Sequence, residues 1–362
     1  MKGVIFRQEE LVDREEEIEF FKEWFEKIPK EILWVYGPKS TGKTTLIEYI
    51  VENELFDDFK LFKSEKYNVK YINFRQKLFG SYESFLNSMM TTDEVIKENS
   101  ADVSLNLGVF KIETKLYEHI KKKEYDFFDE LFKQYQKSDK KSILIIDEIQ
   151  ALEDIYIDKE KELLREFLNF CVRLTKETHL SHVVILSSNT IFINQIYNNA
   201  KLKVTSRFYK ISHLNYETTK EWLKEKNFTQ NEIDLIWEYL GGCIPLIQRM
   251  IRDKHEFSTL KEYLDFQQKI AKSEINMLFR ENRLKDKEYL NPAFLQIAKE
   301  IVENGYFDAN LNTDKYVDMA MEFFSEREIL FFEPLENMVY PNNQLYKKGM
   351  ELVLKDNKCL KK

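Results

Sequence analysis

Eight residues, Gly37–Thr44 (GPKSTGKT), restrict the possible folds of this chain more than any other feature. They match the pattern GxxxxGK[ST] at every fixed position. An apolar run, Ile32–Tyr36, precedes them, and a helix-compatible segment, TTLIEYIVE, follows. A buried strand, a glycine loop and a helix in this order arrange backbone N–H groups and the positive end of the helix around a phosphate. The segment therefore predicts an α/β fold with a phosphate-binding loop (P-loop).

The residues of the P-loop have separable predicted roles. The Lys43 ammonium neutralises phosphate oxygens, and the Thr44 hydroxyl ligates Mg²⁺. The chain has only nine glycines, so a chance match to this pattern would be rare. The other predicted nucleotide-binding positions of the loop are Gly37, Pro38, Lys39, Ser40, Thr41, Gly42 and Thr45.

A second apolar strand, Ser142–Asp147, ends in an acid and is followed directly by Glu148. In P-loop enzymes an aspartate at this strand end holds Mg²⁺. The adjacent glutamate can polarise an attacking water, which is general-base chemistry. A helix cap or a solvated turn is the alternative for such a pair. Because a P-loop precedes it, we interpret the pair Asp147 and Glu148 as catalytic.

Further apolar runs indicate a parallel sheet buried on both faces. They are Val69–Phe74, Val183–Ser188 and, as a fifth strand, Arg207–Ser212. Residues 100–115 alternate between apolar and polar around Gly108, which predicts an inserted β-hairpin.

The chain divides into three predicted units. Residues 1–214 form the α/β core, and the wholly helical pattern of residues 215–285 forms a lid. Residues 286–362 predict two helices and a short hairpin, which is the outline of a winged helix.

The bulk composition excludes several classes of protein. Apolar residues make up 43% of the chain and charged residues 33%, as in ordered globular proteins. No run reaches the roughly 18 consecutive apolar residues of a membrane span, and the acidic N-terminal segment lacks the apolar core of a signal peptide. We therefore expect a cytoplasmic protein with no membrane partner. The three cysteines lack CxxC spacing and predict free thiols.

Five segments together resemble the archaeal ATPase family, a branch of the STAND class of P-loop NTPases that is related to the AAA+ proteins. Two are the P-loop and ILIIDEIQ (Ile143–Gln150). The others are an N-terminal segment with Phe6, Val12–Glu15 and Glu17–Ile18, the strand end Ser187–Asn189, and the turn Gly241–Pro245, which resembles a GGxP motif. The resemblance covers residues 1–250 well and the tail more loosely. It departs at Cys243-Ile244, where the family often has a histidine or asparagine before the proline.

The resemblance implies an AAA+/ASCE-like core of five strands, a helical lid and a winged helix. It implies ATP with Mg²⁺ as the ligand and a switch-like regulatory role. The lack of a guanine-specifying NKxD run also favours ATP over GTP.

The resemblance also implies roles for four residues outside the two central motifs. Arg14 belongs to the segment near the adenine, and Pro245 brings the lid turn to the nucleotide, although this turn could be a simple helix stop. Asn189 is the γ-phosphate sensor, with a strand-end cap as the alternative. Arg207 is a γ-phosphate arginine acting in cis or on a neighbouring subunit, with a surface ion pair as the alternative.

The predicted winged helix has the wrong charge for DNA. Its candidate recognition helix, Thr313–Glu328, carries five acids and two bases. The basic residues lie in the last stretch of the chain, which we interpret as a solvated tail. We expect an ATP- and ADP-binding conformational switch with a protein partner, of open oligomeric state. The alternatives are a DNA-binding initiator or loader of the AAA+ type and a nucleotide-binding scaffold with negligible turnover.

Overall fold

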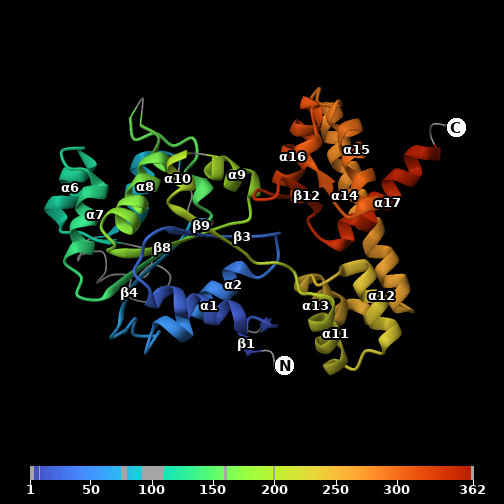
Figure 1. Ribbon diagram of the computed structural model, residues 1–362, viewed down its shortest axis with the longest axis horizontal. Coiled ribbons are helices and arrows are strands. Elements are labelled where there is room, and N and C mark those ends of the chain that lie inside the picture. Colours follow the sequence, from blue (N-terminus) through green and yellow to red (C-terminus); the bar gives the residue numbers. More distant parts are fainter. Residues whose placement is uncertain are drawn as a thin grey trace.

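The central sheet has five parallel strands in the order β4-β7-β8-β3-β9 (Figure 1). Every residue of β3 and β8 is buried, which explains their largely apolar sequences. One strand, β8, separates the strand before the P-loop from the strand that ends in the acidic pair. The predicted α/β class and its five strands are confirmed. The strand bounds are Ile32–Tyr36 (β3), Tyr67–Asn73 (β4), Lys141–Asp147 (β7), Ser181–Ser187 (β8) and Ser206–Lys210 (β9).

Helices cover both faces of this sheet (Figure 1). Leu33 and Val35 of β3 face one layer, while Trp34 and Tyr36 face the other, because successive side chains of a strand point to opposite sides. The first layer consists of α1 (Glu15–Glu26) and α2 (Lys43–Ile50), which continues into a π-helical turn at Val51–Leu55. The second consists chiefly of α7 (Phe127–Gln136), α8 (Leu163–Val172) and α9 (Thr190–Asn198).

The computed structural model describes residues 4–7, 9–74, 80–91, 110–158, 161–198 and 200–359. Within these ranges, no helix combines the length and the apolar character needed to cross a bilayer. The smaller elements of the core are β1 (Val4–Phe6), β2 (Glu9–Leu11), α3 (Tyr82–Met89), β5 (Met90–Thr91), β6 (Phe110–Lys111), α6 (Thr114–Lys121) and α10 (Ala200–Lys203).

The predicted hairpin at residues 100–115 is only partly testable, because residues 100–109 lie outside the described residues. At its end, β6 pairs in parallel with β5 and helix α6 begins at Thr114. A hairpin that continues to residue 115 is therefore wrong at its C-terminal end.

The lid packs four helices around Trp222, Ile236, Met250 and Leu264. Three of them are α11 (Tyr216–Glu225), α12 (Gln230–Leu240) and α13 (Ile244–Asp253), and the fourth is the first half of α14 (Leu260–Leu284).

The remaining elements form the C-terminal unit (residues 286–359), which contains the two helices and the hairpin predicted, in that order, together with strand β10 and helix α17, which were not predicted. Strands β11 and β12 make the expected antiparallel hairpin, with β10 added on the other side of β12. Its elements are α15 (Leu290–Asn304), β10 (Phe307–Asp308), α16 (Lys315–Glu326), β11 (Leu330–Glu333), β12 (Met338–Pro341) and α17 (Gln344–Cys359).

Helices α14 and α17 join the lid to the C-terminal unit, so the expected boundary at residue 285 is not a break in packing. Ala271 of α14 belongs to the lid core, whereas Ile275, one turn later, belongs to the C-terminal core. The interpretation of the basic end as a solvated tail is wrong for residues 344–359, because α17 lies against α14 and buries Met350 and Val353. Lys355 is exposed, whereas Lys348 pairs with Glu238 of the lid.

The turn between α12 and α13 approaches the backbone that enters the lid. The Leu214 N–H donates to the Gly242 carbonyl at 3.1 Å. A Cβ at residue 242 would lie 1.9 Å from the Leu214 carbonyl oxygen, so only glycine fits here.

We expect Gly242→Ala to lower the free energy of unfolding by about 1–3 kcal/mol, because the added methyl forces the turn away from residue 214. Gly80→Ala is the matched control, since a Cβ there meets nothing within 4 Å. Urea unfolding of both variants measures the difference. Equal stabilities would show that the turn moves without cost.

His182 belongs to β8, packs against α1 in the core and is 2% exposed. Its Nε2 lies 2.9 Å from the Lys27 carbonyl oxygen, and Phe25 packs edge-on against the ring. Burial lowers the pKa of this imidazole from 6.5 to about 4. The unfolded chain therefore binds a proton between these pH values that the folded chain does not.

We expect the free energy of unfolding to fall as the pH drops from about 6.5 to about 4, by on the order of 3 kcal/mol from His182. His213 has a similarly lowered pKa of about 4 and adds to the same slope. His182→Gln, which keeps a donor for Lys27, should reduce the slope in urea unfolding across this pH range. An unchanged slope in that variant would refute the assignment.

Candidate functional site

The P-loop curls tightly after β3 because three of its residues, both glycines and Ser40, have positive φ angles. Gly37 has φ 149° and Gly42 has φ 85°. A Cβ on Gly37 would lie 2.0 Å from the Ile211 carbonyl oxygen, just beyond the end of β9. The Lys43 Nζ donates to the carbonyls of Gly37 at 3.0 Å and Pro38 at 2.8 Å. Its ammonium thus lies inside the curve of the loop, where the predicted phosphate belongs.

The two predicted magnesium ligands lie together. The Thr44 hydroxyl donates to the Asp147 carboxylate at 2.9 Å, although 103 residues separate them in the chain. This contact follows from the parallel sheet, because the carboxyl ends of β3 and β7 meet at one edge. A hydroxyl and a carboxylate are hard oxygen donors, which fit Mg²⁺ completed by phosphate oxygens and water. These two residues would hold the ion.

Glu148 has a left-handed backbone conformation, with φ 61° and ψ 50°. Such angles cost a non-glycine residue on the order of 1 kcal/mol and occur preferentially at functional sites. The Glu148 N–H donates to the Leu186 carbonyl at 3.1 Å, which ties the strained residue to β8. The backbone thereby turns directly after Asp147, so the two acids are set at one corner of the sheet.

Two polar side chains hold the Glu148 carboxylate. The Ser188 hydroxyl donates to one oxygen at 3.3 Å, and the Gln150 amide donates to the other. Gln150 is itself held, because its carbonyl oxygen accepts from the Ser187 hydroxyl at 3.2 Å. The end of β8 therefore orients the glutamate that follows β7.

A pocket of about 300 Å³ joins these groups to two other parts of the chain. Small-molecule sites begin at about this size. The N-terminal segment contributes residues 10–12 and Arg14, and the lid contributes its turn. The lining residues are Glu10, Leu11, Val12, Arg14, Lys39–Thr45, Asp147, Glu148, Ser188, Ile244, Pro245 and Gln248.

Arg14 and Pro245 both line the pocket. Arg14 is 6% exposed and donates to the carbonyls of Thr41 at 2.8 Å and Ser212 at 3.2 Å. It also pairs with Glu17 at 2.6 Å. Its guanidinium therefore braces the P-loop against the N-terminal segment. Pro245 stands in the first turn of α13 and faces the pocket from the lid.

Asn189 does not line the pocket. Its side-chain oxygen accepts from the Phe192 N–H at 3.1 Å, which caps the start of α9. The structure thus supports the alternative of a strand-end cap, and the sensor role stays a prediction. The neighbouring Ser188 occupies the pocket wall instead.

Arg207 is also displaced from its predicted role. It pairs in register with Leu33, in the first half of β3 and far from the P-loop end of that strand. Its guanidinium lies 5.2 Å from the Trp24 ring and 5.5 Å from the Phe20 ring, on the layer formed by α1. A γ-phosphate contact in cis is therefore wrong, and a contact to a neighbouring subunit stays a prediction.

Ser188 and Gln248 line the pocket but were not among the predicted site residues. Ser188 is adjacent to the residue that was predicted, and only the turn after β8 determines which of them reaches Glu148. Gln248 follows Pro245 by three residues, so the helical period places both on one side of α13. That spacing could have identified it.

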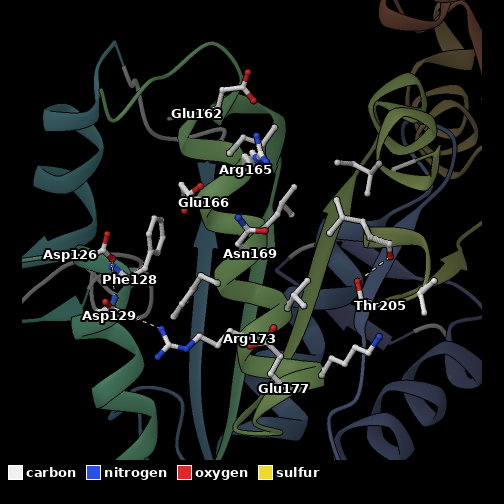
Figure 2. A pocket seen from close by; sticks show the side chains of 18 residues that line it. Asp126, Phe128, Asp129, Glu162, Arg165, Glu166, Asn169, Arg173, Glu177 and Thr205 are labelled. Carbon is white, nitrogen blue, oxygen red and sulfur yellow. Dashed lines mark hydrogen bonds and ion pairs between the residues drawn. The ribbon is translucent and has the colours of Figure 1, made fainter. Parts of the chain in front are cut away.

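A larger hollow of about 1420 Å³ runs along α8, away from the P-loop (Figure 2). At one end of the hollow, the Arg173 guanidinium forms an ion pair with the Asp129 carboxylate at 2.6 Å. Glu162, Arg165 and Glu166 line its other end. Acids and bases alternate on its walls, and none of the predicted site residues lies in it. The hollow is separate from the nucleotide pocket.

The strand, loop, helix and acidic corner define an α/β protein of the P-loop nucleotide-binding class. Residues 11–250 match the model of a family described as an ATPase domain predominantly from Archaea, and the chain belongs to this family. The resemblance inferred from the sequence is confirmed.

Several relatives cover most of the chain. One ATP-binding protein of Methanocaldococcus jannaschii is 32% identical over 290 residues, which is 74% of this chain and 78% of that protein. Another from the same organism is 31% identical over 358 residues, or 94% and 93%. Among solved structures, the Aeropyrum pernix ORC2 protein covers 99% of this chain and 97% of its own, with 11% identity and a TM-score of 0.47. A likeness this remote carries no functional argument.

We expect Asn189→Ala to cost about 1 kcal/mol of stability through loss of the α9 cap and to leave ATP affinity unchanged. Asn189→Asp, which keeps the capping oxygen, should be as stable as the wild type. Thermal unfolding and calorimetric titration with ATP measure the two effects. A large loss of ATP affinity in Asn189→Ala, with stability kept, would support the sensor role.

Proposed function

We propose that this protein binds ATP with Mg²⁺ and hydrolyses the bond between its β- and γ-phosphates. The main support is the position of Glu148, a strained glutamate held by Ser188 and Gln150 beside the contact between Thr44 and Asp147. A carboxylate oriented in this way next to a magnesium site suits activation of a water. The ATP-binding relatives support the choice of adenine nucleotide.

The residues divide the work of hydrolysis as follows. Lys43 and the backbone N–H groups of the P-loop hold the phosphates in line, and Thr44 and Asp147 would hold an Mg²⁺ ion that neutralises their charge. Glu148 accepts a proton from the attacking water, and the oxygen of this water forms a bond to the γ-phosphorus. The bond from the γ-phosphorus to the bridging oxygen breaks, and ADP and inorganic phosphate leave.

We further propose that turnover serves a cytoplasmic switch of the STAND type with a protein partner. The pocket draws residues from the core, the N-terminal segment and the lid, so a bound nucleotide would contact all three parts. ATP and ADP differ only in the γ-phosphate. Contacts to that group must therefore supply the free energy that separates the two states.

The charge of the C-terminal unit favours this role over DNA binding. The outward side of α16 exposes Asp318, Glu322 and Glu326, which would repel phosphates. On α17, Lys348 is paired with Glu238 of the lid at 2.7 Å. The initiator-type alternative predicts salt-dependent binding to duplex DNA, which this surface opposes.

We expect Glu148→Gln to lower Mg²⁺-dependent phosphate release from ATP by about 100-fold or more while ATP binding is kept. Lys43→Ala should weaken binding itself. Arg173→Ala is the control, because its side chain pairs with Asp129 in the hollow away from the P-loop and should not affect turnover. Phosphate release and calorimetric titration measure the two properties. A wild type that binds ATP without releasing phosphate would favour the scaffold alternative.

A further inference from the structure

The C-terminal unit contacts the P-loop directly at Lys39. The Lys39 ammonium pairs with the carboxylate of Glu328, which lies two residues after the end of α16. The Lys39 backbone N–H donates to the Asn342 side-chain oxygen at 3.1 Å, just after β12. Lys39 also lines the nucleotide pocket, together with Lys43 and Glu148. One residue of the phosphate-binding loop is therefore shared between the pocket and the C-terminal unit.

Buried contacts beside Lys39 position this part of the C-terminal unit. Glu333 is 1% exposed and accepts from the Tyr36 hydroxyl at 2.8 Å, one residue before the P-loop. The same carboxylate pairs with Lys210 at the end of β9. His213 Nε2 lies 3.0 Å from the Asn342 carbonyl oxygen. The hairpin β11–β12 is thereby attached to the ends of β3 and β9, which are neighbours in the sheet.

The pair of Lys39 and Glu328 differs from these contacts because it is open to solvent. The Lys39 side chain is 46% exposed and that of Glu328 is 39% exposed. An exposed ion pair contributes little stability and can be exchanged readily. The lysine has a flexible stem that allows its ammonium to reach more than one anion.

We propose that Lys39 is a γ-phosphate ligand and that Glu328 of the C-terminal unit competes with the γ-phosphate for it. A triphosphate held between Lys43 and Glu148 brings its terminal charge into the pocket that Lys39 lines. The more highly charged phosphate then takes the ammonium from Glu328. ADP lacks this group and leaves the pair intact. This inference rests on the proposed ATP binding, and it names the contact through which the nucleotide state reaches the C-terminal unit.

The competition has a reciprocal consequence. Since the γ-phosphate weakens the contact between Lys39 and Glu328, this contact must weaken ATP binding by the same factor. An exposed pair limits that factor to about two- to five-fold. ADP affinity is independent of it.

The test compares the affinities for ADP and for the slowly hydrolysed analogue ATPγS, measured with Mg²⁺ by calorimetric titration. Glu328→Gln should raise ATPγS affinity about two- to five-fold and leave ADP affinity unchanged. Glu326→Gln is the matched control, because it removes one charge from the same end of α16 without touching Lys39. Lys39→Gln should lower ATPγS affinity, and adding Glu328→Gln to it should have no further effect.

The possible results separate this inference from the proposed function. A wild type that binds neither nucleotide overturns the proposed function. Normal binding with equal changes for ADP and ATPγS in Glu328→Gln, or no change, overturns the competition alone. An effect of Glu328→Gln that persists in the Lys39→Gln background also overturns it. Thermal unfolding of each variant verifies that the fold is kept.

Discussion

The hydrogen bond between Thr44 and Asp147 forms only because the sheet of the core brings these distant residues together. The geometry of the candidate site is built around this bond. The bond joins the helix that follows β3 to the end of β7, with β8 between the two strands. Because all five strands are parallel, the ends of β3, β7 and β8 open onto the same edge of the sheet. The ammonium of Lys43, the acids Asp147 and Glu148, and the serines at the end of β8 all lie at that edge.

Strain and polar support act together at this edge. Glu148 is held in a left-handed conformation by its backbone bond to β8. Gln150 and Ser188 then restrict its carboxylate. A glutamate without these partners could rotate away from the phosphates into solvent. A neighbouring strand, β8, thus orients a glutamate that belongs to the motif after β7.

The C-terminal unit is attached to the same edge, and it is not a separate appendage. Buried Glu333 satisfies Tyr36 at the end of β3 and pairs with Lys210 at the end of β9. Helices α14 and α17 connect this unit to the lid, whose turn also faces the pocket. The pocket therefore lies at an edge of the core that the lid turn lines and that the C-terminal unit contacts through Lys39.

The amino-acid sequence by itself determined the class, the P-loop, the acidic pair and the hairpin of the C-terminal unit, because each is a local pattern with a local physical cause. Apolar runs predict buried strands, and fixed glycine and lysine spacing predicts a phosphate loop. Where the local pattern allowed two roles for a side chain, only the tertiary structure showed what that side chain contacts. Asn189 caps a helix while Ser188 reaches the glutamate, and Arg207 lies on the aromatic rings of α1. Residues 344–359 form a packed helix, since α14 offers it a complementary apolar surface. The direction in which a side chain points, and what it meets there, depends on segments far away in the chain.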